Sequence, residues 1–524
     1  MRLRIPAGGV SVVIALLLSA PASSADSFSL GVAAGDVASD SAILWGHADQ
    51  TGTVRLEVAT DQAFTHVIRN LRVEASPEND LTVQRRVGDL RPGTRYWYRF
   101  TSGATASDVG TFVTAPQPNS DATIRFGWTG DYDAERAAGE TEPFWNDFGV
   151  FGSMEAEGNN FNIGLGDTIY SDSEVPGVHP VALTVAQKWA KYALNLGEAP
   201  LAGLRGAAGF YSHWDDHEFI NDFSRFESVF TSGTIDGEVL YGRGVKAFTD
   251  FAPVDYSNRD GLYRTVRWGK NLELFFLDER SFRSAKASKD GVCDNPISGA
   301  PDLAPTAPQT VRSAFSILVP SLSAPVSQEC LDAIDDPNRT FLGEDQLSTF
   351  LKDLKGSKAG FKVVVNELPI QQFYANPYDR WEGYAAERER VLSALQGVKN
   401  VVFLSTDVHA TLVNDARFQT LEPGGPQDSG ILDVSVGPAA TATFNREIVD
   451  TVGNPIAGVG VDAFFFEPPP PFGVGMQCSG IDQFSYGEVE VTSSQLTITP
   501  KDIDGNPLVT DDGPCGSFVL SHQP

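Results

Sequence analysis

Aspartate and histidine side chains follow four short apolar segments of the chain, each within a few residues of the segment's end. They are Asp131, Asp167, the run Asp215-Asp216-His217-Glu218, and Asp407 with His409. Carboxylates brought together would repel one another and would be costly to remove from water, unless cations lay between them. Carboxylate oxygens suit hard cations, and mixed Asp and His sets suit transition metals. The pattern therefore predicts a cluster of two or more metal ions.

Each of these pieces has an ordinary structural interpretation when it is taken alone. Gly166-Asp167 could be a simple turn, and the Asp-Asp-His-Glu run could be the N-cap of a solvated helix. What favours a site is that the pieces recur after successive strands of one domain. His213 is expected to be structural, because alternation along its strand places it on the face opposite Trp214.

The elements that must position these residues begin after Asp121, where short apolar segments alternate with longer helical stretches. Strands are expected at 124–129, 162–165, 209–214, 272–277, 362–365 and 401–405, and helices at 185–196, 343–354 and 383–396. Continuous apolar strands are typical of a sheet covered on both faces, which indicates an α/β domain with a layered sheet. Ligands of such sheets collect at the carboxyl ends of the strands, where the acidic residues fall. The tail adds expected strands at 487–491 and 495–499 and an irregular loop at 464–472.

Residues 27 to about 115 have a different pattern, with short alternating segments separated by turns. Strands are expected at 41–46, 54–59, 81–87, 95–101 and 110–114. The run from Leu90 to Tyr98 is typical of a strand entered through a tyrosine corner, and Trp45 is a candidate core tryptophan. The region resembles a small all-β, fibronectin type III-like sandwich, followed by a linker at 115–120.

The N-terminus has the three parts of a secretory signal peptide, here residues 1–25. Arg2 and Arg4 precede an apolar run at 10–18, and small residues occupy 20–25. The alternative is a buried N-terminal helix. The apolar run is too short for a membrane anchor, and no later stretch resembles a membrane span. A secreted or periplasmic location follows.

The four cysteines agree with export, and they allow three pairings. We favour Cys293 with Cys330 and Cys478 with Cys515, because each bond would clip a loop rich in proline and glycine. Among 524 residues, 68 Asp and Glu face 39 Lys and Arg, which gives a net charge of −29. That excess argues against a nucleic-acid-binding surface and against docking on anionic lipid, and it is compatible with divalent cations. The acidity is also what keeps an exported protein soluble.

Four motifs resemble those of the PhoD family of alkaline phosphatases and phosphodiesterases, within the calcineurin-like metallophosphoesterases. They are GDTIY at 166–170, WDDHEFIND at 214–222, LDER at 277–280 followed by Arg283, and TDVH at 406–409. The resemblance covers nearly the whole mature chain. It implies a PhoD N-terminal domain at 26–116 and a metallophosphatase domain at 117–524, which includes the C-terminal strands and a lid-like loop. The implied fold is a layered β-sandwich flanked by helices.

The resemblance also implies roles for individual residues. Asp167 should bridge metals, Tyr170 should bind iron as a phenolate, and His217 should lie beside the phosphate. The implied metals are ferric iron and calcium, with other divalent cations as alternatives. Arg280 belongs to the phosphate region in this interpretation, or else forms a buried ion pair with Asp278. The implied metal ligands are Asp131, Asp167, Tyr170, Asn221, Asp407 and His409, and the implied catalytic residues are His217, Asp216 and Arg280, with Asp216 or Asn221 supplying a ligand from its segment.

Two positions depart from the family pattern. Asp131 stands where the family often has a cysteine as an iron ligand, and the wider group uses an aspartate there. The strand at 362–365 leads to Asn366 and Glu367, where relatives outside the family place a histidine. Glu367 could bind a cation or cap the turn.

The expected activity is hydrolysis of phosphate esters by a metal-activated water in a secreted enzyme. No nucleophilic serine in a recognisable setting is evident, which disfavours a serine-based alkaline phosphatase. The alternatives are a phospholipase D-like or nucleotide phosphodiesterase using the same site, or a degenerate binding or adhesion protein on the same fold. The preference between monoesters and diesters stays open, as does the oligomeric state. A tail after Asp450 that reached over the site would restrict access to small substrates.

Overall fold

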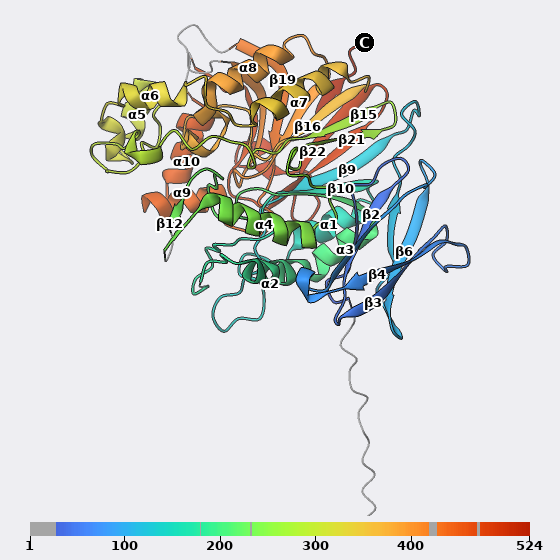
Figure 1. The fold of residues 1–524 in the computed structure, drawn as a ribbon. Helices are drawn as coiled ribbons and strands as arrows, with labels where there is room; N and C mark the ends of the chain where they lie inside the picture. Colours follow the sequence, from blue (N-terminus) through green and yellow to red (C-terminus); the bar gives the residue numbers. More distant parts are fainter. Residues whose placement is uncertain (1–27, 179, 231–232, 419–426, 469–471) are drawn as a thin grey trace, which may run out of the picture.

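The computed structural model describes residues 28–178, 180–230, 233–418, 427–468 and 472–524 (Figure 1). The predicted signal peptide, residues 1–25, lies outside the described residues, as does the proline run 469–471 of the expected tail loop. Two large sheets lie at the centre of the molecule and pack face to face. Helices cover their outer faces.

The first large sheet has nine strands and mixed pairing. Its centre is parallel, because β10 pairs in parallel with β9 on one side and β11 on the other. In sheet order the strands are β25 (Phe518–Ser521), β22 (Gln495–Asp502), β21 (Ser485–Val491), β9 (Ile124–Thr129), β10 (Phe161–Leu165), β11 (Gly209–His213), β1 (Val32–Gly35), β2 (Ala42–His47) and β5 (Thr82–Val87).

The second large sheet has seven strands, and β15, β16, β17 and β19 run parallel within it. In sheet order these are β14 (Arg264–Trp268), β15 (Leu272–Phe276), β16 (Phe361–Val365), β17 (Val401–Ser405), β19 (Gln427–Ser435), β18 (Thr411–Phe418) and β20 (Met476–Gly480). Both sheets thus present the carboxyl ends of several parallel strands.

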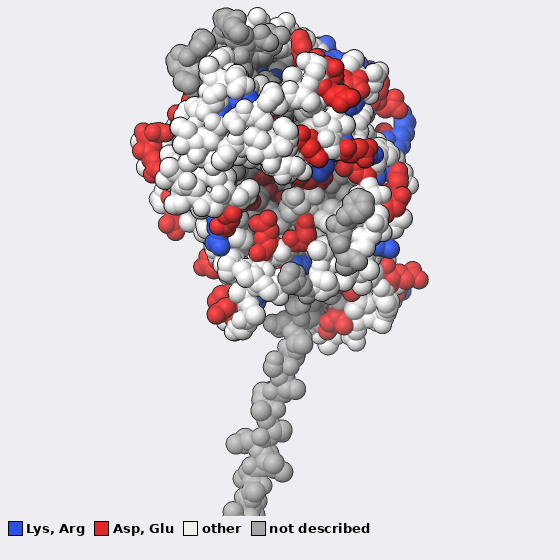
Figure 2. All heavy atoms as spheres, turned by 90° about the vertical axis from the view of Figure 1, so that its left-hand side faces the viewer, with Lys and Arg blue, Asp and Glu red and all other residues white. Residues whose placement is uncertain are grey.

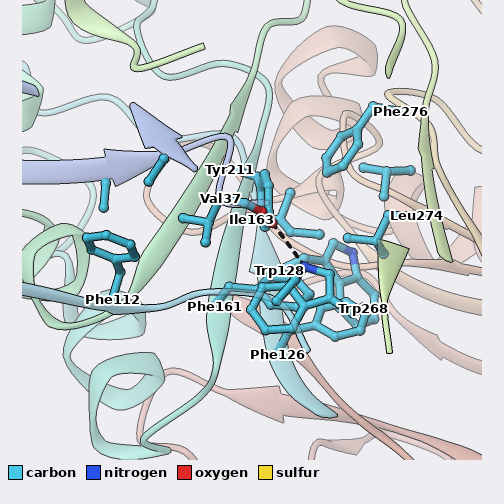
Figure 3. Close-up of a cluster of buried hydrophobic side chains, with 14 of the residues drawn as sticks. Val37, Phe112, Phe126, Trp128, Phe161, Ile163, Tyr211, Trp268, Leu274 and Phe276 are labelled. Atoms are coloured by element: carbon cyan, nitrogen blue, oxygen red, sulfur yellow. Dashed lines mark hydrogen bonds between the residues drawn. The ribbon is translucent and has the colours of Figure 1, made fainter. Parts of the chain in front are cut away.

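Aromatic side chains fill the space between the two sheets (Figure 3). Phe161 of the first sheet stacks on Phe126, with ring centroids 4.9 Å apart, and meets Trp268 of the second sheet at 4.5 Å. The indole Nε1 of Trp268 donates a hydrogen bond to Tyr211 Oη at 3.0 Å, so its one polar group is satisfied inside the core. Large buried rings of this kind supply much of the burial energy that holds the sheets together.

Helices form the two outer layers. Phe210, near the start of β11, and Trp214, just after its end, pack with the helices on the first sheet. Phe403 of β17 packs with the helices on the second. The first set is α1 (Gly149–Ala156), α2 (Val185–Leu196), α3 (Ala199–Ala207) and α4 (Gly237–Phe251), and the second is α7 (Glu344–Gly356) and α8 (Ala385–Leu395). The expected α/β fold with a layered β-sandwich flanked by helices is confirmed at this level.

The remaining helices are α5 (Gln309–Phe315), α6 (Gln328–Ile334), α9 (Phe444–Val452), α10 (Ala457–Val461), the π-helix η6 (Asp462–Phe466), and the 3₁₀ turns η1 (Pro77–Asn79), η2 (Lys289–Gly291), η3 (Pro320–Ser323), η4 (Pro377–Asp379) and η5 (Trp381–Tyr384). Two small ribbons are β12 (Val229–Phe230) with β13 (Thr234–Ile235), and β23 (Val509–Thr510) with β24 (Gly513–Pro514). The irregular loop expected from residue 464 is wrong in its first part, since η6 continues to Phe466 and buries Phe465 and Phe466. Among the described residues, no helix is long and apolar enough to cross a membrane.

The strands of the N-terminal region belong to two sheets. A five-stranded sheet contains β3 (Gly52–Ala59), β4 (Val67–Ala75), β6 (Arg95–Ser102), β7 (Thr105–Ala106) and β8 (Gly110–Val113), while β1, β2 and β5 extend the nine-stranded sheet. The junction is parallel pairing of β1 with β11, with Ala34 opposite Gly209. The region is therefore continuous with the larger domain, and its likeness to fibronectin type III domains stays a prediction.

The two signature residues of the predicted sandwich have different outcomes. The tyrosine corner is confirmed, because Tyr96 Oη accepts the Arg91 backbone N–H at 2.8 Å. Trp45 as a core residue of the sandwich is wrong. Its neighbour Leu44 points into that core, so strand alternation turns Trp45 toward the helices, where Nε1 donates to the Asp250 carbonyl at 2.8 Å.

Both predicted disulfides are present, Cys293–Cys330 and Cys478–Cys515. The first ties α6 to the loop after η2, and the second ties β20 to the chain after β24.

Candidate metal centre

The carboxyl ends of the parallel strands of both sheets meet at one place. Asp131 follows β9 and Asp167 follows β10, while Asp407 and His409 follow β17 of the other sheet. The Asp407 backbone N–H donates to Asp131 Oδ1 at 3.2 Å, and Thr406 Oγ1 donates to the Leu165 carbonyl at 2.6 Å. The strand-end turns of the two sheets are therefore bonded to each other, which fixes the acidic residues as one group.

Four of these residues adopt a left-handed backbone that is uncommon outside glycine. The φ angles are 61° for Asp131, 48° for Asp167, 64° for Asp407 and 52° for His409. Such conformations cost on the order of 1–3 kcal/mol each and persist only when the surroundings impose them. Their recurrence at the strand ends indicates turns shaped to direct side chains into a site.

Donor atoms of these side chains form overlapping groups. Asp131, Asp167 and His409 place one donor atom each within 4.8 Å of one another, and Asp167, Asp216 and His217 do the same. Asp167 belongs to both groups, which is the arrangement of a residue that bridges two ions. A third group joins Asp215, Asp216 and Asp407, and a fourth joins Asp216, Asp222 and Asp379.

The predicted ligands Tyr170 and Asn221 differ in position. Tyr170 is buried, and its Oη lies 3.0 Å from His409 Nε2, beside the first group. Asn221 is exposed, and its recorded contact is a backbone N–H donated to Asp172 Oδ2 at 2.9 Å. The structure therefore brings Tyr170 to the cluster and leaves the side chain of Asn221 at its rim.

The electrostatics of the cluster favour cations. Burial raises the pKa of Asp131 to about 7 and that of Asp215 to about 6, and it raises the pKa of Asp167 well above its ordinary value. The Oδ2 atoms of all three are buried and accept no hydrogen bond from the described residues. Buried carboxylates without donors are unfavourable, and a bound cation reverses that cost. Carboxylate, imidazole and phenol donors fit such ions.

Two glycines allow the turns to approach this closely. A Cβ on Gly437, whose φ is 114°, would lie 2.7 Å from Asp131 Oδ2. A Cβ on Gly166, whose φ is 82°, would lie 2.6 Å from the Asp215 Cβ. Both contacts are shorter than real Cβ atoms tolerate, so only glycine fits beside the acidic groups.

Glu218 supports the turns that carry the cluster, and it belongs to none of the donor groups. Its carboxylate accepts the backbone N–H groups of Asp167 at 3.1 Å, Thr168 at 2.7 Å and Asp215 at 2.8 Å. These bonds tie the turn after β10 to the turn after β11. The Asp-Asp-His-Glu run is therefore a buried turn, and the alternative of a solvated helix start is wrong.

His217 is oriented by a carboxylate that the sequence interpretation did not include. Its Nδ1 lies 2.7 Å from Asp172 Oδ1, its ring stacks on Tyr170 with centroids 4.1 Å apart, and its backbone N–H donates to Asp167 Oδ1 at 3.1 Å. Burial lowers the pKa of His217, but Asp172, Asp167 and Asp216 outweigh burial and hold it well above its ordinary value. The surrounding carboxylates thus favour the protonated imidazole.

We expect Asp172→Asn to lower kcat by about 10- to 100-fold, the usual effect of losing a carboxylate that orients a histidine. The amide keeps the shape of Asp172 but not its charge, so the pKa of His217 should fall and the alkaline limb of the kcat–pH profile should move to lower pH. Steady-state kinetics of the metal-loaded protein across pH measures this. Glu142→Gln, on an exposed side chain, serves as control, and an unchanged pH profile in Asp172→Asn would contradict the role.

Arg280 is fully buried among carboxylates. Its Nη1 donates to Asp379 Oδ2 at 2.6 Å, its Nε donates to Asp215, and its Nη2 lies 3.6 Å from an oxygen of Asp407. The alternative of an ion pair with Asp278 is wrong. Asp278 accepts a hydrogen bond from the backbone N–H of Arg280, at 3.2 Å, and not from its guanidinium. Arg280 therefore belongs to the cluster.

Glu367 and His213 lie behind the cluster. Glu367 Oε2 accepts the Glu279 backbone N–H at 2.7 Å, and the Glu279 carboxylate accepts the Leu368 N–H at 2.9 Å. Of the two roles left open for Glu367, these bonds favour capping the turn. His213 Nδ1 lies 3.3 Å from Glu367 Oε1, away from the metal-ligand groups, which agrees with a structural role.

Several residues of the site were not predicted from the sequence. Asp172 lies two residues after Tyr170, the last residue of the GDTIY motif. Its closeness to that motif could have marked it as a candidate site residue. Asp379 comes from η4 and Glu447 from α9, and neither follows a strand or a motif. Asp222 ends the WDDHEFIND motif, and its backbone N–H bonds to Asp216.

The face that looks left in Figure 1 is turned toward the viewer in Figure 2, which shows a hollow across it with Asp and Glu side chains in and around it. This surface matches the net charge of −29. An acidic rim of this kind does not by itself attract phosphate esters, so cations within the site would have to supply the attraction.

Known proteins are similar to this chain in sequence and in fold. A family model described as PhoD-like phosphatase matches residues 136–457, more than half of the chain, and one described as PhoD-like phosphatase, N-terminal domain, matches residues 15–116. Alkaline phosphatase D of Bacillus subtilis (strain 168) is 26% identical over 431 residues, which cover 75% of this chain and 66% of that relative.

Two solved structures are similar in fold. A structure of PhoD has a TM-score of 0.69 at 22% identity. The match covers 96% of this chain and 90% of that one. A purple acid phosphatase from yellow lupin (Lupinus luteus) seeds has a TM-score of 0.56 at 12% identity, with 94% of this chain and 73% of that one covered.

Proposed function

Because this chain belongs to the PhoD-like phosphatase family, we propose that it is a secreted phosphoesterase that hydrolyses phosphate esters with two or more bound metal ions. The observation that carries this proposal is the position of Asp167. It is shared by two groups of donor atoms, and one of its buried oxygens accepts no hydrogen bond from the described residues. Two ions sharing one carboxylate is the arrangement that serves an in-line displacement at phosphorus.

The donor types suggest which residues would hold which ion. Asp131, Asp167, Tyr170 and His409 would hold the first, for which we propose ferric iron, since a phenolate is a strong ligand of that ion. Asp167, Asp216 and Asp407, with all-oxygen donors, would hold the second, for which we propose calcium. When bound, such ions lower the pKa of a coordinated water and neutralise phosphate oxygens.

The protein's own groups would then bind and orient the substrate. His217 is buried, with Nδ1 engaged by Asp172, so a proton on its Nε2 would be the one available to a leaving-group oxygen. Arg280 keeps Asp215 and Asp379 paired and adds positive charge between Asp216 and Asp407. Because it is buried at 0% exposure, its guanidinium acts in a medium where electrostatic attraction is strong.

Export and substrate range are parts of the same proposal. The signal-like N-terminus and two disulfides favour an oxidising compartment. A tail after Asp450 that reached over the site would restrict the enzyme to small monoesters. Phospholipase D-like and nucleotide phosphodiesterase activities remain alternatives for the substrate class.

The test is to strip the protein with chelator and then restore ferric iron, calcium or both, with hydrolysis of chromogenic phosphate monoesters and diesters as readout. We expect the stripped protein to be inactive and the restored protein to regain activity, with the ratio of diester to monoester rates defining its class. Hydrolysis by metal-free protein, or a phosphoserine intermediate trapped during turnover, would contradict the proposal. Full metal binding without hydrolysis of any ester would favour the binding-protein alternative.

A further inference from the structure

The first turn of α9 holds His409 at two points. The backbone N–H of Phe444, the first residue of α9, donates to the His409 carbonyl at 2.9 Å. One turn along, Glu447 Oε1 lies 2.5 Å from His409 Nδ1. The helix therefore fixes both the backbone and the ring of this residue.

The two ring nitrogens of His409 have different surroundings. Nδ1 faces Glu447, whereas Nε2 lies 3.0 Å from Tyr170 Oη. The residue also belongs to the donor group formed with Asp131 and Asp167. A carboxylate at Nδ1 favours the tautomer with hydrogen on that nitrogen, which leaves the Nε2 lone pair for a metal ion.

The first turn of α9, which carries Glu447, is held in place by several contacts of its own. Thr443 Oγ1 and Asn445 Nδ2 both donate to the Asp482 carboxylate, at 2.5 and 3.0 Å, and the Asn445 backbone N–H donates to the Ile481 carbonyl at 2.9 Å. The Phe444 ring packs against Phe466 with centroids 4.9 Å apart. The start of α9 is thus anchored independently of His409, and the side chain of Glu447 is only 34% exposed.

We propose that Glu447 is a positioning residue of the metal centre, which holds His409 in the tautomer and orientation that present Nε2 to the first ion. This inference rests on the proposed function and goes further, because it makes a residue of α9 part of the metal centre. Glu447 would act through His409, without touching the ion or the substrate.

The test compares Glu447→Ala and Glu447→Gln with Asp450→Asn, a neutralised carboxylate on the same helix whose side chain is 73% exposed. Each protein is loaded with iron and calcium, dialysed against a graded series of chelator concentrations, and assayed for both metals by elemental analysis. We expect Glu447→Ala to lose one metal per chain at about 10- to 100-fold lower chelator concentration. Glu447→Gln, whose amide oxygen leaves a neutral acceptor beside Nδ1, should lie between Glu447→Ala and wild type, and Asp450→Asn should match wild type.

Wild-type retention of both metals by Glu447→Ala would overturn the inference, and so would equal losses in Glu447→Ala and Asp450→Asn. If Glu447→Ala fails to fold, Glu447→Gln decides on the same readout. The outcomes separate from those of the proposed function. Wild-type protein that binds metals but hydrolyses no ester would sink the function and leave the Glu447 result standing, while active, fully metal-retaining Glu447→Ala would do the reverse.

Discussion

Replacing Asp167 with asparagine is expected to lower kcat by about 10³-fold, because several kcal/mol of transition-state stabilisation would be lost with the ions that this carboxylate joins. Asp167 belongs to the donor group with Asp131 and His409 and to the group with Asp216 and His217, and it is the one residue common to these two groups. Elemental analysis of Asp167→Asn should show fewer metals per chain. Asp332→Asn, on an exposed residue of α6, should keep wild-type activity and metal content.

The same variant should stabilise the protein once its metals are stripped. Burial raises the folded-state pKa of Asp167 above its unfolded value, so ionisation of Asp167 destabilises the metal-free fold as pH rises above about 4. Asparagine removes that cost, and the metal-free melting temperature of Asp167→Asn should exceed that of wild type at neutral pH and match it more closely at pH 4. A variant that is inactive and also less stable without metals would indicate misfolding and contradict this account.

Replacing Arg280 with methionine is expected to cost about 3–5 kcal/mol of unfolding free energy, the range for breaking a buried ion pair. Asp215 and Asp379 would keep their buried carboxylates without the guanidinium that now bonds to both. Denaturant unfolding of the metal-loaded proteins measures the change. The matched control is Arg390→Met, because Arg390 pairs with Glu344 on the surface, with side chains 50% and 67% exposed. It should cost about 0–1 kcal/mol.

The activity of Arg280→Met should also fall, since the positive charge beside Asp216 and Asp407 disappears. Equal destabilisation by the two methionine variants would show that burial does not strengthen the Arg280 ion pairs. An Arg280→Met protein with wild-type stability and activity would contradict its place in the site altogether.

The site residues that directly follow strands could be predicted from the sequence. Asp131, Asp167, Asp216 and His409 follow apolar strands, and parallel strands must bring their carboxyl ends together. The bonds between the two sheets, such as Asp407 to Asp131, then place both sets at one point. That step depends on sheet packing, for which the sequence pattern carries no direct signal.

Residues that reach the site from loops and distant helices could not be predicted in this way. Asp379 is held by Arg280 from the turn η4, and Glu447 meets His409 from α9, 38 positions along the chain. Their positions follow from tertiary packing, not from any local periodicity. Trp45 fails for a related reason, because a buried tryptophan in a strand can serve either face, and the choice depends on which layer lies on each side.

The N-terminal region shows the same limit at the level of the fold. Its alternating pattern predicted a separate small all-β sandwich, whereas the strands of the structure divide between a five-stranded sheet and the nine-stranded sheet. Pairing of β1 with β11 joins it to the larger sheet over a single residue pair, Ala34 and Gly209, and nothing in either strand marks that contact beforehand.

The most direct test of the central claim is an anomalous-scattering map of crystals of the metal-loaded protein, collected on both sides of the iron absorption edge. Two neighbouring peaks are expected, one among Asp131, Asp167, Tyr170 and His409 and one among Asp167, Asp216 and Asp407. Loss of the first peak below the edge would assign it to iron. A map without peaks at the ends of β9, β10 and β17, or with metal bound elsewhere, would contradict the account.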